Sequence, residues 1–250
     1  MFAPLELNKQ HLLREGHPAN KVWVTGGVVV DALEAKRKMK SEKSVFDVYP
    51  QLEQGEWIRV DIHRRGNQHQ GRFKAIIEGV KQLVEKGYHV NFVEMNTTKQ
   101  SLDMYNLRPI IEGLKKHDNF LHTEVWPEFS HVLEFYESKH CFAALTDSGG
   151  VQEEMNLLGK PCLTCRFNTD RPETVMNAYT NILVPPISGE FITKMIDYIH
   201  NSSEIQQKMR SGKKLYGEEV GKKFISTVKG LMEQRAKPFS WTHDEWNLFD

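Results

Sequence analysis

One short segment combines glycines, a hydroxyl and carboxylates at a spacing that suits a phosphorylated ligand. In residues 146–154, TDSGGVQEE, a polar turn with Gly149 and Gly150 follows the apolar run CFAAL. Glycines let an anion reach the backbone N–H groups of a helix start without meeting a Cβ. Ser148 can add a hydroxyl donor, and Glu154, one turn later, can accept hydrogen bonds from two neighbouring hydroxyls of a ribose. The segment is either a nucleotide-diphosphate site or an Asp/Ser helix cap whose glycines permit close packing.

Two further segments carry cationic side chains directly after predicted strands. In DIHRRGN (61–67), His63 and Arg64 supply charge-assisted donors for a phosphate or a leaving group, or else belong to a solvated loop. In NTDRPETV, Arg171 precedes Pro172, which favours the first position of a helix. Its guanidinium therefore faces either the same ligand or solvent.

The aromatic segment EVWPEFSHVLEFY leaves two interpretations open. Trp126, Phe129 or Phe135 could stack on a nucleotide base, or each could pack in the core. The cysteines have a simpler explanation. Cys162 and Cys165 form a CxxC on a predicted strand, where residues three apart point to opposite faces. We therefore expect buried structural cysteines rather than a redox or zinc motif.

Alternating strand-like and helix-like segments position these residues. The strand-like segments are 21–25, 56–62, 89–95, 120–123, 141–146, 161–166 and 181–185. The spacing of apolar residues predicts helices near 70–86, 101–116, 128–138, 189–200, 203–212 and 217–235. Repeated β–α units predict an α/β fold, a Rossmann-like three-layer domain with a mostly parallel sheet about six strands wide. Because ligands of such sheets bind at the carboxyl ends of the strands, TDSGG and DIHRR are expected at the same edge.

The two ends of the chain differ from this repeating middle part. Residues 1–20 predict a short helix but no strand, and we expect them to precede a Rossmann-like domain over 21–215. Residues 216–250 predict a closing helix and an aromatic tail, which we expect to dock on this domain or on a partner.

Composition excludes several classes of protein. The 250 residues include 33 basic and 33 acidic side chains, so no net field favours nucleic acid or an anionic membrane. Hydrophobic residues make up 39%, as in ordinary globular proteins, and no apolar run approaches the roughly 18 residues of a membrane span. The N-terminus shows no signal-peptide pattern, so we expect a cytoplasmic protein.

The order of these motifs resembles that of the non-hydrolysing UDP-N-acetylglucosamine 2-epimerases. TDSGGVQEE, LGKP (158–161) and TDRPE (169–173) are similar to the family motifs T-D-S-G-G-x-Q-E-E, L-G-K-P and T-x-R-P-E. Residues 1–20 resemble the family's interdomain segment, and VTGGVVVDAL resembles the first strand and helix of its C-terminal domain. The resemblance covers residues 1 to about 235 and implies the C-terminal half of a GT-B-like fold, with a UDP-sugar in its cleft.

The resemblance assigns the UDP-binding residues one by one. It implies that Ser148, Gly149 and Gly150 hold the diphosphate, that Glu154 binds the ribose hydroxyls, and that Arg171 lies near the phosphates. It implies no metal and no cofactor.

The resemblance also implies a reaction, in which UDP is eliminated to leave 2-acetamidoglucal and is re-added after C2 is reprotonated. His63, in the family's H-R-R motif, is the implied catalytic residue beside the diphosphate leaving group, and Arg64 adds to UDP binding. Phe135 is the implied neighbour of the uracil. Such a reaction belongs to cell-surface polysaccharide biosynthesis.

Departures from the family pattern limit this assignment. The family's opening domain, which carries the acidic residues assigned to proton transfer at C2, has no counterpart in the chain. Gly66 replaces a glutamate, and the segment where a histidine is expected, after the next strand, has Glu94, Met95 and Asn96 instead. We expect a domain that binds UDP-GlcNAc or UDP-ManNAc and is catalytic only with an N-terminal-type domain on another chain, or as a fragment of a longer protein. A homodimer is a further expected form of partner. The alternatives are the donor-binding subunit of a split glycosyltransferase and a non-catalytic UDP-sugar binder.

Overall fold

The computed structural model describes residues 1–39 and 41–234, which form two compact units. The small unit comprises Met1–Asp31 and the chain from Gly217, and the large unit comprises Ala32–Tyr216. The expected aromatic tail, 235–250, lies outside the described residues. Among the described helices, none is both long and apolar enough to cross a membrane.

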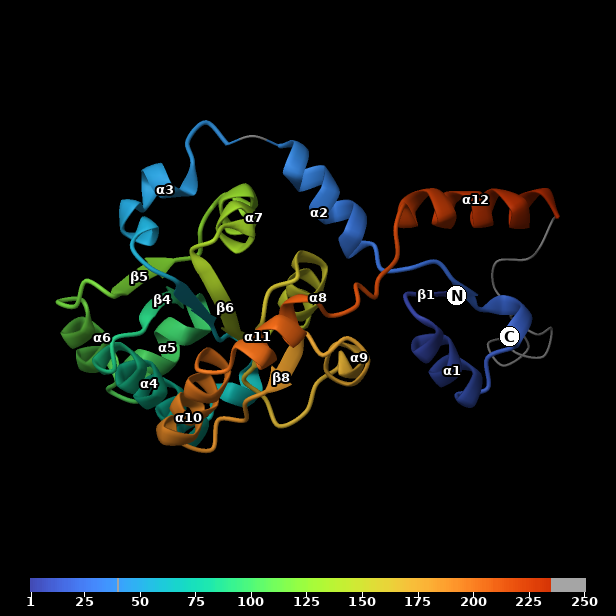
Figure 1. Ribbon diagram of the computed structural model, residues 1–250. Coiled ribbons are helices and arrows are strands. Elements are labelled where there is room, and N and C mark those ends of the chain that lie inside the picture. Colours follow the sequence, from blue (N-terminus) through green and yellow to red (C-terminus); the bar gives the residue numbers. More distant parts are fainter. Residues whose placement is uncertain (40, 235–250) are drawn as a thin grey trace, which may run out of the picture. The chain divides into compact units, whose positions relative to one another are not determined.

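The large unit is built on one parallel sheet of six strands in the order β5-β4-β3-β6-β7-β8 (Figure 1). The strands are β3 (Trp57–Asp61), β4 (His89–Glu94), β5 (Phe120–Glu124), β6 (Cys141–Thr146), β7 (Cys162–Thr164) and β8 (Asn181–Leu183). Every neighbouring pair is parallel. This architecture confirms the α/β fold and the expected width of the sheet.

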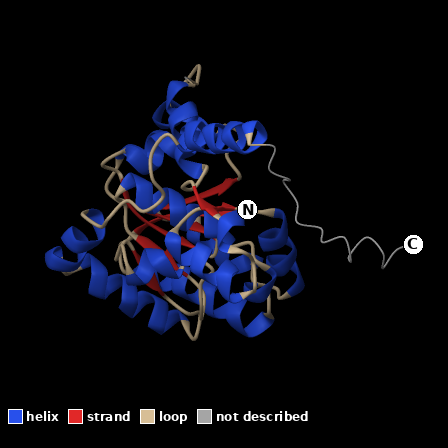
Figure 2. Cartoon of the chain, turned by 90° about the vertical axis from the view of Figure 1, so that its right-hand side faces the viewer, coloured by secondary structure: helices blue, strands red, loops and turns tan. Residues whose placement is uncertain are grey.

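Helices cover both faces of the sheet, as the sequence pattern predicts (Figure 2). Strand β3 shows how the two layers are separated, because successive side chains point to opposite faces. Ile58 and Val60 join the larger core cluster with the apolar residues of α4 (Gln70–Glu85) and α10 (Gly189–His200). Trp57 joins a second cluster with those of α7 (Phe129–Glu137) and α8 (Gly149–Leu158). The remaining side chains of the Trp57 face, Arg59 and Asp61, are polar although buried.

The helices of the described chain follow the predicted spacing with one correction. They are α1 (Glu6–Arg14), α2 (Val29–Lys38), α3 (Val45–Val48), α4 (Gln70–Glu85), α5 (Asn96–Met104), α6 (Arg108–Leu114), α7 (Phe129–Glu137), α8 (Gly149–Leu158), α9 (Pro172–Met176), α10 (Gly189–His200), α11 (Ser203–Arg210) and α12 (Val220–Glu233). The single helix predicted over 101–116 is wrong. Asn106 adopts φ 53°, which ends α5, and Pro109 lies in the first turn of α6, where its missing N–H costs no hydrogen bond.

The small unit contains a strand that the sequence pattern did not predict. Strand β1 (Phe2–Ala3) pairs in parallel with β2 (Trp23–Val24) in a separate two-stranded sheet. The expectation of no strand in 1–20, and of 21–25 within the main sheet, is therefore wrong. A two-residue strand is too short to show alternation, and its pairing depends on contacts distant in sequence, such as Phe2 with Trp23 (5.8 Å between ring centroids) and Phe224 (4.3 Å).

The cysteines are structural, as expected. Cys141, Cys162 and Cys165 are free and buried. Cys162 packs in the cluster on the α7 and α8 face, and Cys165 packs in the cluster on the α4 face. Burial raises the pKa of both thiols well above the ordinary value, so neither is a reactive thiolate near neutral pH.

Gly212 offers a sharp test of the packing around β8. A Cβ at this position would lie 2.3 Å from the carbonyl oxygen of Ala178 and 2.4 Å from Cγ2 of Thr180. Because a backbone carbonyl cannot move aside as a side chain can, Gly212→Ala is expected to lower the free energy of unfolding by about 1–3 kcal/mol in urea titrations. Gly113→Ala is the matched control, since nothing lies within 4 Å of its Cβ position. Equal unfolding midpoints for the two variants would contradict this description of the packing.

Candidate nucleotide-diphosphate site

The turn after β6 leads into α8, and the N–H groups in the first turn of this helix are accessible. Ser148 is the N-cap of α8, and its Oγ accepts a hydrogen bond from the Val151 N–H at 3.4 Å. The hydroxyl proton of Ser148 remains available to a ligand. A Cβ on the exposed Gly150 would have only Ser148 Oγ, at 3.9 Å, within 4 Å. The turn is thus a helix cap and, at the same time, a surface on which N–H groups of the first turn are accessible to an anion.

Asp147 joins this turn to the loop after β3. Its carboxylate is fully buried and accepts three hydrogen bonds of 3.0 Å, from the backbone N–H groups of His63 and Arg64 and from Nδ2 of Asn67. Nδ1 of His63 lies 3.4 Å from Oδ1 of Asp147. Strands β3 and β6 are neighbours at the point where the strand order reverses, the place where ligands bind in such sheets. The structure therefore brings the two predicted segments together at one edge.

Three arginines gather around Asp170 beside the start of α8. The Asp170 carboxylate is 3.1 Å from Nη2 of Arg64, 2.9 Å from Nη1 of Arg166 and 3.9 Å from Nη1 of Arg171. Although burial opposes the shift, Arg166 and Arg64 hold the pKa of Asp170 below its ordinary value. Arg64 also explains the buried Gly149, because a Cβ there would lie 3.2 Å from its Nη2.

The arginine cluster continues onto α8 through Arg171. Its Nε donates to the carboxylate of Glu153, and its Nη1 donates to the carbonyl of Asp170 at 2.9 Å. Three guanidinium groups gather here, and charge-assisted donors of this kind suit a diphosphate.

Glu154 differs from its neighbour Glu153 in having no donor. It is half-buried, and within the described part of the chain no group is hydrogen-bonded to its carboxylate. Burial, together with the charges of Asp61 and Glu153, raises the pKa of Glu154 to about 7. A partly desolvated carboxylate without donors is suited to accept hydrogen bonds from the hydroxyls of a ligand.

Among the predicted site residues, Phe135 is the one that the structure does not place beside the start of α8. Its ring is fully buried and makes an edge contact with Trp126, at 5.7 Å between ring centroids. Trp126 is also buried, so neither ring presents a face to a base in this conformation. Both rings thus pack in the core of the described structure, and the role of Phe135 beside a uracil stays a prediction.

A pocket of about 510 Å³ opens beside His63 and is lined by residues at and beyond the ends of β4 and β5, among them Glu94 and Glu124. Glu94 is one of three residues, with Met95 and Asn96, in the segment where the resemblance suggests a histidine. Its two carboxylate oxygens lie 3.2 and 3.3 Å from the guanidinium of Arg108, and one of them is 2.7 Å from Nε2 of His122. Glu94 is therefore held in an ion-pair network and is not a free base. The described residues include no group of three or more side chains that could hold a metal ion.

Sequence reasoning missed Asp61, Asp147 and Asp170, which organise the site. The available signal was their position, since each acidic residue lies at or just beyond the carboxyl end of a predicted strand or within a quoted motif. Their partners come from loops distant in sequence, and no local pattern identifies those partners.

The fold and this edge place the large unit in a class, the Rossmann-like α/β domains of GT-B-like proteins. Residues 1–229 match the family model described as UDP-N-acetylglucosamine 2-epimerase, and the chain belongs to that family. The UDP-N-acetylglucosamine 2-epimerase of Methanocaldococcus jannaschii is 34% identical over 190 residues, which cover 74% of this chain and 50% of that protein.

Other relatives agree. The UDP-N-acetylglucosamine 2-epimerase of Salmonella typhimurium is 31% identical over 218 residues, covering 84% of this chain and 55% of that protein. The crystal structure of the Neisseria meningitidis UDP-GlcNAc 2-epimerase bound to UDP-GlcNAc is similar with a TM-score of 0.74 and 29% identity, over 93% of this chain and 61% of that chain. The chain thus spans only about half of the length of the relatives it matches.

Proposed function

We propose that this chain binds UDP-GlcNAc and UDP-ManNAc at the edge formed by the ends of β3 and β6. The observation that carries the proposal is the convergence of an accessible helix start, three arginines and the carboxylate of Glu154, which accepts no hydrogen bond from the residues that the structure describes. The helix start and Arg64 would bind the diphosphate, and Glu154 would bind the ribose. The relatives named above include an enzyme with UDP-GlcNAc bound, which supports the same ligand class.

His63 is the proposed catalytic residue at the leaving group. Its Nδ1 lies toward the buried Asp147, so its Nε2 is the nitrogen available to the pocket. A donor at that position would stabilise the charge that develops on the diphosphate as the bond to the sugar breaks.

We propose that epimerisation requires an N-terminal-type domain, supplied by another chain, by a second copy or by another part of a longer protein. Epimerisation at C2 needs a base on one face of the sugar and an acid on the other. Of the carboxylates around the pocket, Glu94 is already bound by Arg108 and His122. The proposed location is the cytoplasm.

The test follows the C2 proton of UDP-GlcNAc by NMR in heavy water, alongside calorimetry with UDP. We expect UDP to bind and the C2 proton to stay in place with the chain alone, and to exchange once the N-terminal domain of a relative is added. Rapid exchange by the chain alone would overturn the requirement for a partner, and absence of UDP binding would overturn the site. Sugar transfer to an acceptor without an epimerised product would instead identify a split glycosyltransferase.

A further inference from the structure

A buried carboxylate lies behind the diphosphate turn and is linked to it by hydrogen bonds. Asp61, the last residue of β3, is only 4% exposed and is paired in register with Thr146 of β6. The Thr146 hydroxyl donates to Oδ1 of Asp61, and the same hydroxyl oxygen accepts the backbone N–H of Ser148 at 3.0 Å. One chain of hydrogen bonds therefore runs from Asp61 to the N-cap of α8.

Six groups from five elements face Asp61. Arg59 belongs to the same strand, Thr146 and Asp147 lie at the end of β6, and Tyr136, Glu154 and Cys162 belong to α7, α8 and β7. Among the described residues, Thr146 alone is hydrogen-bonded to the Asp61 side chain.

The nearest cation does not neutralise Asp61 by direct contact. Nη1 of Arg59 donates to Oδ1 of Asn91 at 2.6 Å, and its guanidinium covers the ring of Trp126 at 3.9 Å. Two desolvated carboxylates, Asp61 and Glu154, are thus left within electrostatic reach of each other. Burial raises the pKa of Asp61 to about 7, against the opposing effects of Thr146 and Arg59, and the pKa of Glu154 is also raised to about 7.

We propose that Asp61 is a positioning residue of the site, which orients the Ser148 N–H through the Thr146 hydroxyl and whose charge acts on Glu154. This proposal rests on the proposed UDP site. Two carboxylates in one desolvated region do not ionise independently, because the first negative charge opposes the second. The protonation of Asp61 would therefore set the pH at which Glu154 becomes the ionised acceptor that ribose hydroxyls require.

The sign of the pH effect follows from this coupling. Protonation of Glu154 removes part of its acceptor capacity, so UDP affinity is expected to fall as the pH drops through about 7. Asp61→Asn keeps an oxygen for the Thr146 hydroxyl and removes the second charge. In that variant the fall in UDP affinity should move to lower pH by about one unit.

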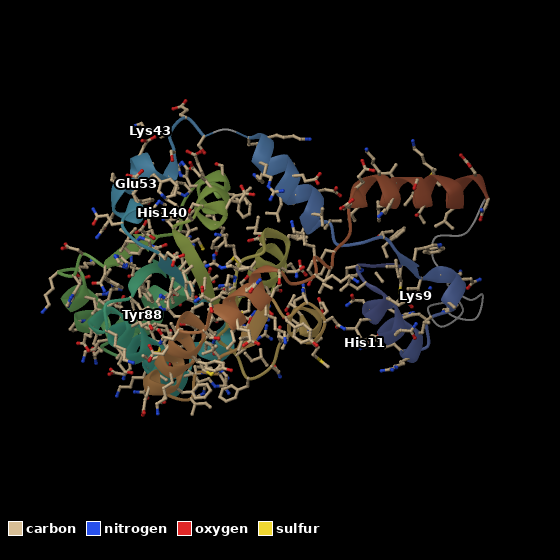
Figure 3. The ribbon with its side chains drawn as sticks, in the orientation of Figure 1. Lys9, His11, Lys43, Glu53, Tyr88 and His140 are labelled. Carbon is tan, nitrogen blue, oxygen red and sulfur yellow. The ribbon has the colours of Figure 1, made fainter. Side chains whose placement is uncertain are left out.

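The experiment combines two measurements on the whole chain. The first is an NMR titration of the Glu154 carboxyl carbon without ligand, in the wild type and in Asp61→Asn, where the midpoint should fall by about one pH unit. The second is UDP calorimetry between about pH 5.5 and 8.5. The control is Asp197→Asn, which removes a carboxylate that accepts from Tyr88 at the amino end of β4 (Tyr88 is labelled in Figure 3) and should leave both profiles unchanged.

A second variant tests the hydrogen-bond chain itself. Thr146→Val removes the acceptor of the Ser148 N–H, so the Ser148 amide signal should stop following the Asp61 titration, and UDP affinity should fall about tenfold. An unchanged Glu154 midpoint in Asp61→Asn, or a Ser148 amide that still follows the Asp61 titration in Thr146→Val, would overturn the proposal. If the wild type binds no UDP, the proposed function fails, whereas the titrations without ligand still decide whether the two carboxylates are coupled.

Discussion

Replacing Glu154 with alanine is expected to weaken UDP binding by about 10- to 100-fold, the effect of removing a charged acceptor from hydroxyl donors. The expectation rests on a half-buried carboxylate that no donor within the described residues satisfies. Because the substitution removes no hydrogen bond among the described residues, the free energy of unfolding should not decrease. The measurement is calorimetry with UDP at about pH 8, where Glu154 is ionised.

Two further variants serve as an intermediate case and as a control. Glu154→Gln keeps one acceptor oxygen and should bind UDP with intermediate affinity. Glu190→Ala removes an exposed glutamate from α10, outside the site, and should bind UDP as the wild type does. Wild-type affinity in Glu154→Ala would remove this residue from the proposed site.

Replacing Asp147 with alanine is expected to lower the free energy of unfolding by about 3–5 kcal/mol, as when one partner of a buried charged network is removed. The carboxylate is fully buried, and its loss leaves the N–H groups of His63 and Arg64 and the amide of Asn67 without their acceptor. UDP affinity should fall as well, because the loop that carries His63 loses its attachment to the turn. Denaturant unfolding with calorimetry on the same samples measures both effects.

The control for this variant is Asp170→Asn, which breaks partly exposed ion pairs with Arg64 and Arg166. Such pairs contribute about 0–1 kcal/mol to stability, so this change should be small. Similar losses of stability in Asp147→Ala and Asp170→Asn would contradict the role of Asp147 as the buried junction of the two loops.

Most of the fold could be predicted from the sequence, because a helix or strand with one buried face has apolar residues at a regular spacing. The helix predicted at 189–200 has the bounds of α10, and the strands from 56 onward form the expected six-stranded sheet. The predictions were wrong where the spacing of apolar residues gives no signal. A two-residue strand such as β1 is too short to show a regular spacing. The break between α5 and α6 depends on the left-handed conformation of Asn106.

The candidate site could be predicted in part for a similar reason. Ser148, Gly149 and Gly150 belong to a local turn, whose function depends on its own backbone. The roles of Asp61 and Asp147 depend on which strands are neighbours, and this pairing is a property of the whole sheet. Phe135 could not be assigned from the sequence for another reason. Residue type alone does not distinguish a ring that stacks on a base from one that is buried against Trp126.

The bonds of Asp147 also have a consequence for the order in which the protein assembles. They join residues that are 84 and 83 positions apart, and β4, β5 and their helices lie between them in the chain. Closing a contact over such a distance costs chain entropy, and no local element offsets this cost. The bonds of Asp147 therefore form only when β6 has docked against β3. The edge that would bind a ligand is therefore absent from any partly folded chain without that pairing. A ligand that binds this edge binds only chains in which β3 and β6 are paired, and it would therefore stabilise the native state against unfolding.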